Sequence, residues 1–347
     1  MTERQWTDLL KLVNEGGISR SAGFIIDSPW LPGWAGMSKI DYYSSGEHWF
    51  EANRRAVETF PDIIFLPGFW SEFGMFTEPS AFGAKVTWHE DSLPWAGKVL
   101  HDITDAGLLE DPDPERDGML PFVVARLQHY HDKIRTLGHE IRFAVARGPL
   151  NIASYLRGTT ELMTDLMMQP DAVEQLLEKI TSFLERWLIL QKERFPSIGG
   201  ILLLDDLIGF IGEEAFRRFV LPHFRRLFHA FDAPVRFLHN DAQGLITARY
   251  LTEMGVNLFN FSFEHSLDEI RELAGPGVVL LGNLPPRDVL AAGTADEVKK
   301  ATKEMVTSTR HPERILWSCG GGMPPDVPTG NIQAFLEGME EGLNTIP

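Results

Sequence analysis

Three residues with metal-binding chemistry occur where two apolar runs of the sequence end. The run VRFLHND ends with His239 and Asp241, and the run ILWSC ends with Cys319. Because residues i and i+2 of a strand point to the same side, His239 and Asp241 can converge on one point that Cys319 reaches from another strand end. An imidazole, a carboxylate and a thiolate, with a fourth position shared with substrate, would make a catalytic zinc shell. The simpler alternative is a hydrogen-bonded histidine and a buried cysteine, because H-x-D is not a specific motif.

Other polar side chains also stand at the ends of apolar runs. They are Asp27, Asp205, Asp206, Glu264, His265 and Asn283. In a barrel of parallel strands, the loops after the strands form the functional face, so these residues are further candidates for chemistry.

Aromatic residues are concentrated near the start of the chain. Residues 24–88 hold 15 of the 37 aromatic residues. Trp30 and Trp34 lie in SPWLPGWAG, and Trp70 lies in PGFWSEFG, which are Pro/Gly-punctuated loops after predicted strands. Two interpretations stay open: these tryptophans line a substrate pocket, or they are packed in the core.

Eight short apolar runs alternate with longer amphipathic segments along the whole chain. The runs are Gly23–Asp27, Asp62–Leu66, Ile141–Ala146, Gly200–Asp205, Val235–His239, Asn257–Phe263, Val278–Gly282 and Ile315–Cys319. Nearly continuous apolar runs of this length are typical of parallel strands covered on both faces. The alternation predicts a (β/α)8 TIM barrel with an aromatic-rich N-terminal elaboration. The other candidate is an open doubly wound sheet, but no G-x-G-x-x-G follows the first run and no P-loop is present.

The amphipathic segments predict helices between the strands. One helix begins near Asp171, because the apolar residues after it recur at i, i+3 and i+4 spacing. Three other predicted helices span Glu213–Phe231, which Pro222 interrupts, Ala295–Thr309 and Gln333–Leu343.

Composition limits the class of protein. The chain has 347 residues, a net charge of −17 and 44% hydrophobic residues, which suffices for a large core. The acidic balance argues against nucleic acid or an anionic membrane as a partner, and no apolar run approaches the roughly 20 residues of a membrane span. The N-terminus has no signal-peptide core, and a single cysteine excludes an internal disulfide. We therefore expect one domain over residues 1–347 and a cytoplasmic enzyme.

Four segments spread over the chain resemble the uroporphyrinogen decarboxylase superfamily. They are EPSAFGAKVTW at Glu78–Trp88, GPLNIASYLRG at Gly148–Gly158, GNLPPRDVLAAGTADEV at Gly282–Val298 and SCGGGMPPDVPTGNIQAF at Ser318–Phe335. The resemblance implies the same (β/α)8 barrel.

Within that superfamily, the chain resembles the cobalamin-dependent methyltransferases. True decarboxylases need an Arg-rich N-terminal loop to pair with an octacarboxylate, whereas the stretch DSPWLPGWAGMSK has no arginine. The methyltransferases that act on coenzyme M carry zinc on H-x-C and a late cysteine. This chain has His239, then Asp241 where that cysteine would be, and Cys319 in the matching late place.

The exchange of a thiolate for Asp241 implies a harder, more Lewis-acidic zinc that suits an oxygen substrate. With it, the chain resembles the methyltransferase component of O-demethylase systems. Such components move a methyl group from an aryl methyl ether to the cob(I)alamin of a corrinoid protein. The resemblance thus implies zinc and partner-held cobalamin as cofactors, and a small methoxylated aromatic as substrate.

The same resemblance suggests roles for four carboxylates. Glu72 or Glu78 would protonate or position the ether oxygen, and either could instead be the fourth zinc ligand. Asp205 and Asp206 could position a phenolic hydroxyl or simply bond to backbone amides. Our preferred assignment gives catalysis to Glu72 and Asp206, and the fourth metal position to Glu78.

Three other functions stay open at this point. One is a decarboxylase acting on a porphyrin-like or smaller carboxylate, which needs no metal. Another is a methylcobalamin:thiol methyltransferase of the coenzyme M type. The third is a corrinoid- or tetrapyrrole-binding protein without catalytic activity. The methyl donor, the corrinoid partner and the oligomeric state, including a homodimer, stay open as well.

Overall fold

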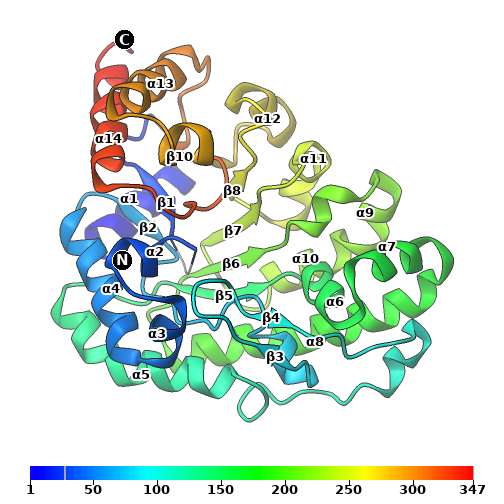
Figure 1. Ribbon diagram of the computed structural model, residues 1–347. Coiled ribbons are helices and arrows are strands. Elements are labelled where there is room, and N and C mark those ends of the chain that lie inside the picture. Colours follow the sequence, from blue (N-terminus) through cyan, green and yellow to red (C-terminus); the bar gives the residue numbers. More distant parts are fainter. Residues whose placement is uncertain (27–28, 347) are drawn as a thin grey trace.

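Parallel strands form the centre of the molecule, and helices surround them (Figure 1). The structure is a computed structural model that describes residues 1–26 and 29–346. Its parallel strands are β1 (Gly23–Ile25), β2 (Ile64–Leu66), β5 (Phe143–Arg147), β6 (Gly200–Leu204), β7 (Val235–Asn240), β8 (Leu258–Phe261), β9 (Val279–Leu284) and β10 (Ile315–Cys319). Six of them run in the order β10-β9-β8-β7-β6-β5, and the β1-β2 pair adjoins β10 through a parallel bridge between Ala22 and Trp317. This arrangement agrees with the predicted (β/α)8 barrel.

Each of these strands coincides with one of the eight predicted runs, although several ends differ. The first run was expected to end at Asp27, which lies outside the described residues. The run expected at residues 257–263 gives a shorter strand that ends at Phe261. The reason is local, because the Ser262 hydroxyl accepts the Glu264 N–H at 3.3 Å and the chain turns there.

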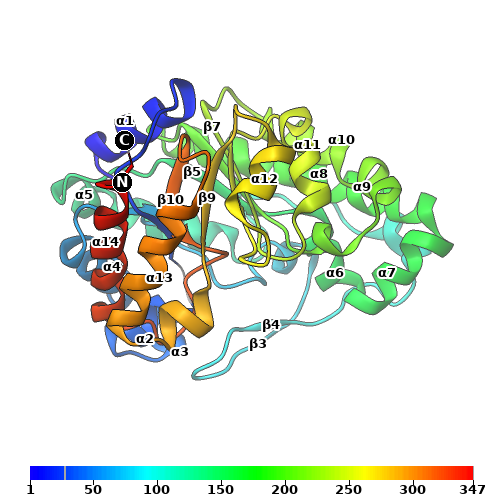
Figure 2. The ribbon, with the colours of Figure 1, turned by 90° about the horizontal axis from the view of Figure 1, so that it is seen from above.

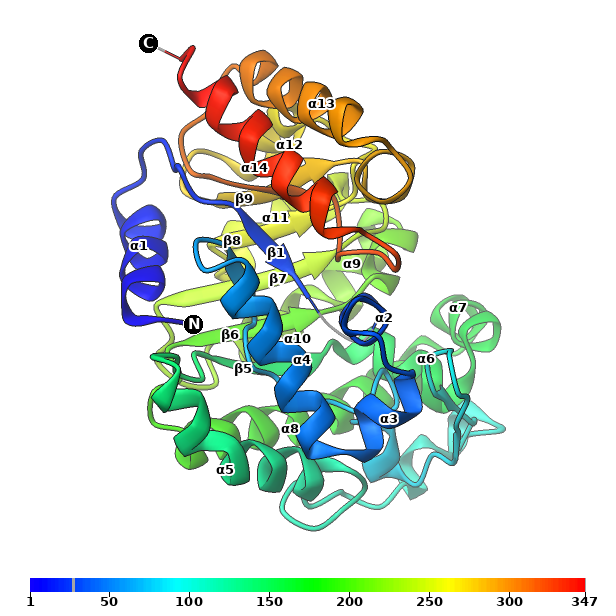
Figure 3. The same cartoon turned by 60° about the vertical axis from the view of Figure 1, so that its left-hand side comes forward.

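The helices around the strands follow the amphipathic segments. They are α1 (Glu3–Asn14), α2 (Leu31–Ala35), α3 (Lys39–Ser44), α4 (Gly46–Thr59), α5 (Leu120–Thr136), α6 (Pro149–Arg157), α7 (Thr159–Met168), α8 (Pro170–Arg194), α9 (Glu213–Phe219), α10 (Leu221–Phe228), α11 (Leu245–Met254), α12 (Leu267–Ala274), α13 (Ala295–Ser308) and α14 (Thr329–Leu343). The helix predicted over Glu213–Phe231 is divided at Val220, because Pro222 has no N–H and fits only the first turn of a new helix. Helices α13 and α14 lie side by side in Figure 3. No helix in the described part of the chain combines the length and apolarity needed to cross a membrane.

The N-terminal third adds elements that a simple barrel lacks. Short helices α2 and α3 precede α4, which agrees with the predicted elaboration. An antiparallel hairpin of β3 (Val86–Thr87) and β4 (Trp95–Ala96), which was not predicted from the sequence, extends away from the body in Figure 2. With two residues per strand, the hairpin has no apolar periodicity to detect.

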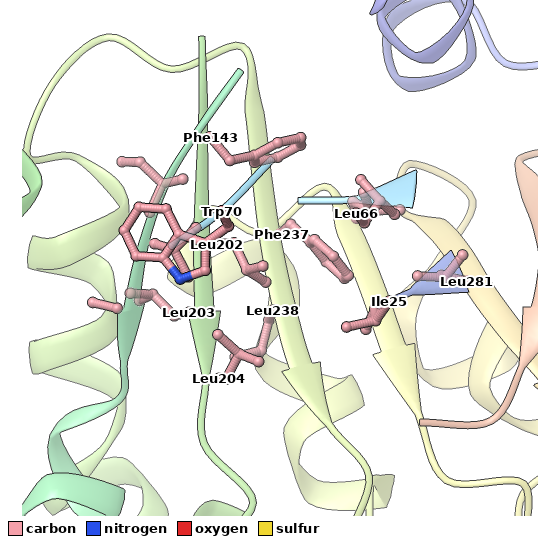
Figure 4. Close-up of a cluster of buried hydrophobic side chains, with 14 of the residues drawn as sticks. Ile25, Leu66, Trp70, Phe143, Leu202, Leu203, Leu204, Phe237, Leu238 and Leu281 are labelled. Atoms are coloured by element: carbon pink, nitrogen blue, oxygen red, sulfur yellow. The ribbon is translucent and has the colours of Figure 1, made fainter. Parts of the chain in front are cut away.

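The core fills the space among the strands. Figure 4 shows side chains from β1, β2, β5, β6, β7 and β9 in one buried cluster. Gly200 makes room for it, because a Cβ at that position would lie 2.5 Å from the ring of Phe143. Trp70, from the loop after β2, belongs to the same cluster.

Candidate metal centre

A row of residues crosses four neighbouring strands near their carboxyl ends. Arg147 of β5 is in register with Leu204 of β6, Leu204 with His239 of β7, and His239 with Asn260 of β8. Residues in register on parallel strands point to the same face of the sheet. The row therefore brings a guanidinium, an imidazole and an amide to one face near the ends of the strands.

The hydrogen bond to Asn260 determines which nitrogen of His239 is free. The Nδ1 atom of His239 lies 2.7 Å from Oδ1 of Asn260. The amide nitrogen of Asn260 donates to the Leu281 carbonyl at 2.8 Å, which fixes the orientation of the amide. His239 must therefore donate through Nδ1–H, and its Nε2 carries the lone pair that a metal needs.

Two carboxylates face this Nε2 atom. It lies 3.8 Å from Oδ1 of Asp206 and 4.0 Å from Oδ2 of Asp241. These distances are too long for hydrogen bonds. Metal–ligand bonds of about 2.0–2.2 Å in a tetrahedral zinc site would separate ligand atoms by roughly 3.3–3.6 Å. A small inward movement of the three side chains would bring their ligand atoms to the spacing of a divalent-cation site. This set of donors fits zinc.

The two carboxylates are also joined to each other. The backbone N–H of Asp241 donates to Oδ1 of Asp206 at 3.0 Å. Partial desolvation raises the pKa of Asp241, and the neighbouring Asp206 raises it further, while His239 opposes the shift. Repulsion between the carboxylates would be relieved by a cation between them.

Cys319 lies close to this cluster but is not part of it. The three residues whose ligand atoms lie within 4.8 Å of one another are Asp206, His239 and Asp241. The sulfur of Cys319 is fully buried and donates to the Gly321 carbonyl at 3.7 Å. Burial raises the pKa of the Cys319 thiol to about 12, and the nearby Asp241 contributes. The thiol therefore stays protonated unless a cation displaces its proton.

The residues predicted from the sequence to share one site are His239, Asp241 and Cys319. The structure brings the first two together and adds Asp206, while Cys319 adjoins them at the end of β10. As a zinc ligand, Cys319 remains a prediction.

Glu72 and Glu78 meet at Arg147, outside the three-residue cluster. The guanidinium of Arg147 donates to Glu72 at 2.7 Å, and its backbone N–H donates to Glu78 at 3.1 Å. Burial raises the pKa of Glu78 to about 7, Arg147 opposes the shift and Glu72 adds to it. Glu78 therefore holds a proton for part of the time at neutral pH. The structure engages Glu78 with Arg147, and its role as a fourth metal ligand remains a prediction.

Asp205 is bound by the backbone. Its carboxylate accepts the N–H groups of Asn151 at 3.0 Å and Leu207 at 3.1 Å. Burial raises the pKa of Asp205 to about 8, although the backbone hydrogen bonds oppose the shift. This geometry matches the simpler interpretation of Asp205, in which it bonds to backbone amides.

The three tryptophans differ in their surroundings. Trp30 is fully buried, stacks on Trp34 at 4.9 Å and donates its indole N–H to the Val327 carbonyl at 3.0 Å. Trp34 donates to the Thr329 hydroxyl at 3.0 Å, so both rings pack against the start of α14. Trp70 is also buried, but its indole N–H has no hydrogen-bond partner among the described residues. Trp70 thus differs from the other two in that its indole N–H is enclosed without a partner in the described structure. The substrate-binding role of all three remains a prediction.

Known proteins give the family. The model of the uroporphyrinogen decarboxylase family matches residues 34–342. The chain belongs to the uroporphyrinogen decarboxylase family. Human uroporphyrinogen decarboxylase is 24% identical over 282 residues, which cover 76% of this chain and 73% of that protein. Methylated-thiol–coenzyme M methyltransferase from Methanosarcina mazei is 23% identical over 274 residues, which cover 78% of this chain and 71% of that protein.

A solved structure confirms the fold of this family member. A methyltransferase from Methanosarcina mazei superposes with a TM-score of 0.80 at 17% identity and covers 97% of this chain and 98% of that one. The family and the barrel predicted from the sequence are thus confirmed, and its relatives include both decarboxylases and methyltransferases.

Two residues that organise the site of this family member were not predicted from the sequence. Asn260 orients His239, and Arg147 holds Glu72 and Glu78. Both could have been found from one signal, which is a polar residue inside or at the end of an otherwise apolar run. The runs LFNF and FAVAR contain them.

Proposed function

We propose that this protein is a zinc-dependent methyltransferase that moves a methyl group from an aryl methyl ether to the cob(I)alamin of a corrinoid protein. The observation that carries this proposal is the cluster of Asp206, His239 and Asp241 beside Cys319. The methyltransferases among its relatives support the reaction class. The carboxylates in the cluster support an oxygen substrate, because hard donors keep zinc more Lewis-acidic than thiolates do.

Residues at the strand ends would hold the metal. His239 would bind through Nε2, with Asp241 and Cys319 as further ligands, and Asp206 is as close to Nε2 as Asp241 is. One of the two aspartates can therefore bind the metal while the other positions the substrate. Zinc bound here would act as a Lewis acid on the ether oxygen. Phenolate is a poor leaving group without such assistance.

The carboxylates at Arg147 would act on the same oxygen. The guanidinium orients Glu72, and Glu78 can hold a proton on its buried carboxyl near neutral pH. The same groups influence Tyr155, whose pKa burial raises, with Asp206 and Glu72 adding to the shift. Because Asp206 and Glu72 both act on Tyr155, the carboxylates at Arg147 and the candidate metal cluster lie within electrostatic range of one residue.

The loop after β2 would contribute the ring pocket. Trp70 is buried among apolar side chains of the barrel, and its indole N–H has no partner in the described structure. A flat apolar wall suits a methoxylated ring and keeps water from the methyl group. We therefore assign ring binding first to Trp70.

A corrinoid protein would dock over the strand ends, where the chain exposes apolar side chains. Phe210, Leu245 and Phe263 follow β6, β7 and β8, and are 68%, 39% and 44% exposed. The backbone of Phe263 lies against Gly320, next to Cys319. Exposed apolar residues around a site support a protein partner there. Bound cobalamin would supply the nucleophile that accepts the methyl group.

The test is methyl transfer from a panel of methoxylated aromatics to cob(I)alamin. We expect methylcobalamin with aryl ethers, and a loss of about 100-fold or more in rate for His239→Ala, because a catalytic ligand is removed. The exposed His229 provides the matched control, His229→Ala, which should stay active. Trp70→Ala should lose more free energy of substrate binding, taken from the rise in KM for the aryl ether, than free energy of unfolding. Reaction only with thioethers or aliphatic donors, or decarboxylation of a porphyrinogen, would refute the proposal.

A further inference from the structure

A separate cavity lies among helices α3, α4 and α5, and none of its lining residues belongs to the candidate metal centre. Its volume is about 720 Å³, within the roughly 300–1,000 Å³ typical of small-molecule sites. Five large aromatic side chains contribute to its walls, and they are Tyr43, Phe73, Trp88, Phe122 and Tyr130.

One cation faces this cavity. The guanidinium of Arg126 lies 4.6 Å from the centroid of the Phe73 ring, and its Nη2 donates to the Tyr43 carbonyl. Its Nη1 is buried and has no hydrogen-bond partner among the described residues. Burial lowers the pKa of Arg126, and the groups that oppose this shift are the phenols of Tyr42 and Tyr130, not carboxylates.

A half-buried guanidinium with an unpaired N–H donor is unfavourable unless an anion or a hydrogen-bond acceptor pairs with it. The chain carries a net charge of −17, so carboxylates are abundant, and yet none in the described structure pairs with Arg126. The guanidinium of Arg126 thus lines the cavity without a partner of opposite charge in the described structure, and an anionic ligand in the cavity would supply one.

The helix α5 presents a continuous face to the cavity. Phe122, Ala125, Arg126 and His129 recur at i, i+3, i+4 and i+7 spacing, which brings them to one side of a helix. Phe122 is 60% exposed, which is unusual for a side chain of this size unless it contacts a ligand or partner. Across the cavity, Tyr43 and Trp88 pack with their ring centroids 5.7 Å apart.

We propose that this cavity binds a small aromatic carboxylate, with the ring against the aromatic walls and the carboxylate on the guanidinium of Arg126. Charge-assisted hydrogen bonds from a guanidinium to a carboxylate are among the strongest polar contacts in proteins. The aromatic walls select a ring over an aliphatic acid. The site does not depend on the proposed methyl transfer, because it shares no residue with the metal centre.

The test is calorimetric titration of the metal-free protein with benzoate, benzyl alcohol and acetate. We expect benzoate to bind with a Kd at least about tenfold lower than that of the neutral alcohol or of acetate, because only benzoate has both ring and charge. Arg126→Met should raise the Kd for benzoate at least about tenfold, a change that one good charged hydrogen bond can produce. Arg135→Met removes an exposed charge from the same helix and should change nothing.

Two further variants keep the proposal falsifiable. Phe122→Ala removes an exposed ring, so it should fold and bind benzoate more weakly, even if Arg126→Met does not fold. His239→Ala should leave the Kd unchanged. Equal binding of benzoate and benzyl alcohol, no benzoate binding at all, or loss of binding in His239→Ala would overturn the proposal.

Discussion

His239 is oriented by a neighbour that lies on the next strand. Asn260 accepts its Nδ1–H, and the Leu281 carbonyl in turn holds the Asn260 amide. Such outer partners fix the tautomer and the ring orientation of a metal-binding histidine. The free Nε2 is thus prepared before any cation binds.

The hardness of the ligands can be tested at Asp241. We expect Asp241→Cys to keep zinc and to lose about 100-fold in ether cleavage, because a second thiolate donates more charge and weakens Lewis acidity. Zinc content and the rate of methyl transfer from an aryl ether measure the two effects separately. Unchanged ether cleavage would show that ligand hardness does not select the substrate.

At the residue scale, period-two reasoning predicted part of the site. It predicted that His239 and Asp241 share a side, and the two side chains do face each other at 4.0 Å. It could not predict the contribution of Asp206 to the same cluster, because that depends on a turn after β6 and on a hydrogen bond from the Asp241 backbone. Asn260 was missed because only polar residues at the ends of the apolar runs were taken as candidates, and Asn260 lies inside its run.

At the element scale, the glycine segment after β10 lies against Asp241, which follows β7. Gly321 has a φ of +81°, and a Cβ on it would lie 3.0 Å from Oδ2 of Asp241. Both features require glycine at this position. The segment after Cys319 therefore packs against Asp241, a carboxylate of the candidate metal centre.

Gly321→Ala should weaken zinc binding about tenfold or more, because the new methyl group displaces Asp241 from its ligand position. The neighbouring Gly322 provides the control, since a Cβ there would have no atom within 4 Å. Competition with a chromogenic chelator measures both affinities. Equal zinc affinity of Gly321→Ala and Gly322→Ala would contradict this role.

The turn after α5 makes stability depend on pH. His139 is 8% exposed, and burial lowers its pKa to about 4, with the Met1 amino group adding to the shift. In the unfolded chain it would titrate near 6.5. The folded state thus binds fewer protons than the unfolded state between about pH 6.5 and 4, and stability is lost as the pH falls through that window.

Between pH 7 and pH 4.5, the free energy of unfolding of His139→Gln should fall by about 1–3 kcal/mol less than that of the wild type, because Gln does not titrate. Urea unfolding of the wild type and the variant at pH 7 and pH 4.5 measures the difference. The exposed His129 gives the control His129→Gln. If the wild type and His139→Gln lost equal stability between the two pH values, His139 would not be the titrating group.

The main elements were predictable because strong physical signals mark them. The continuous apolar runs at β6 and β10 predict buried strands, and Pro222 marks the break between α9 and α10. The β3–β4 hairpin was not predictable, because its short strands carry no periodic pattern.

At the scale of the whole molecule, an acidic protein exposes apolar side chains around its strand ends. Phe210→Glu should raise KM for a corrinoid protein about tenfold or more and leave the reaction with free cob(I)alamin unchanged, because only the protein partner contacts that surface. Leu108 is 80% exposed, so Leu108→Glu is the matched control. Equal effects of the two variants, or an equal effect on free cob(I)alamin, would rule out docking at Phe210.

The metal content of the purified protein tests the central claim most directly. Elemental analysis should find about one zinc per chain in the wild type and in His229→Ala, and less than about a tenth of that in His239→Ala, because a ligand of a four-coordinate site is lost. Wild-type protein without stoichiometric zinc after growth and refolding in zinc, or His239→Ala with the same zinc content, would contradict the account.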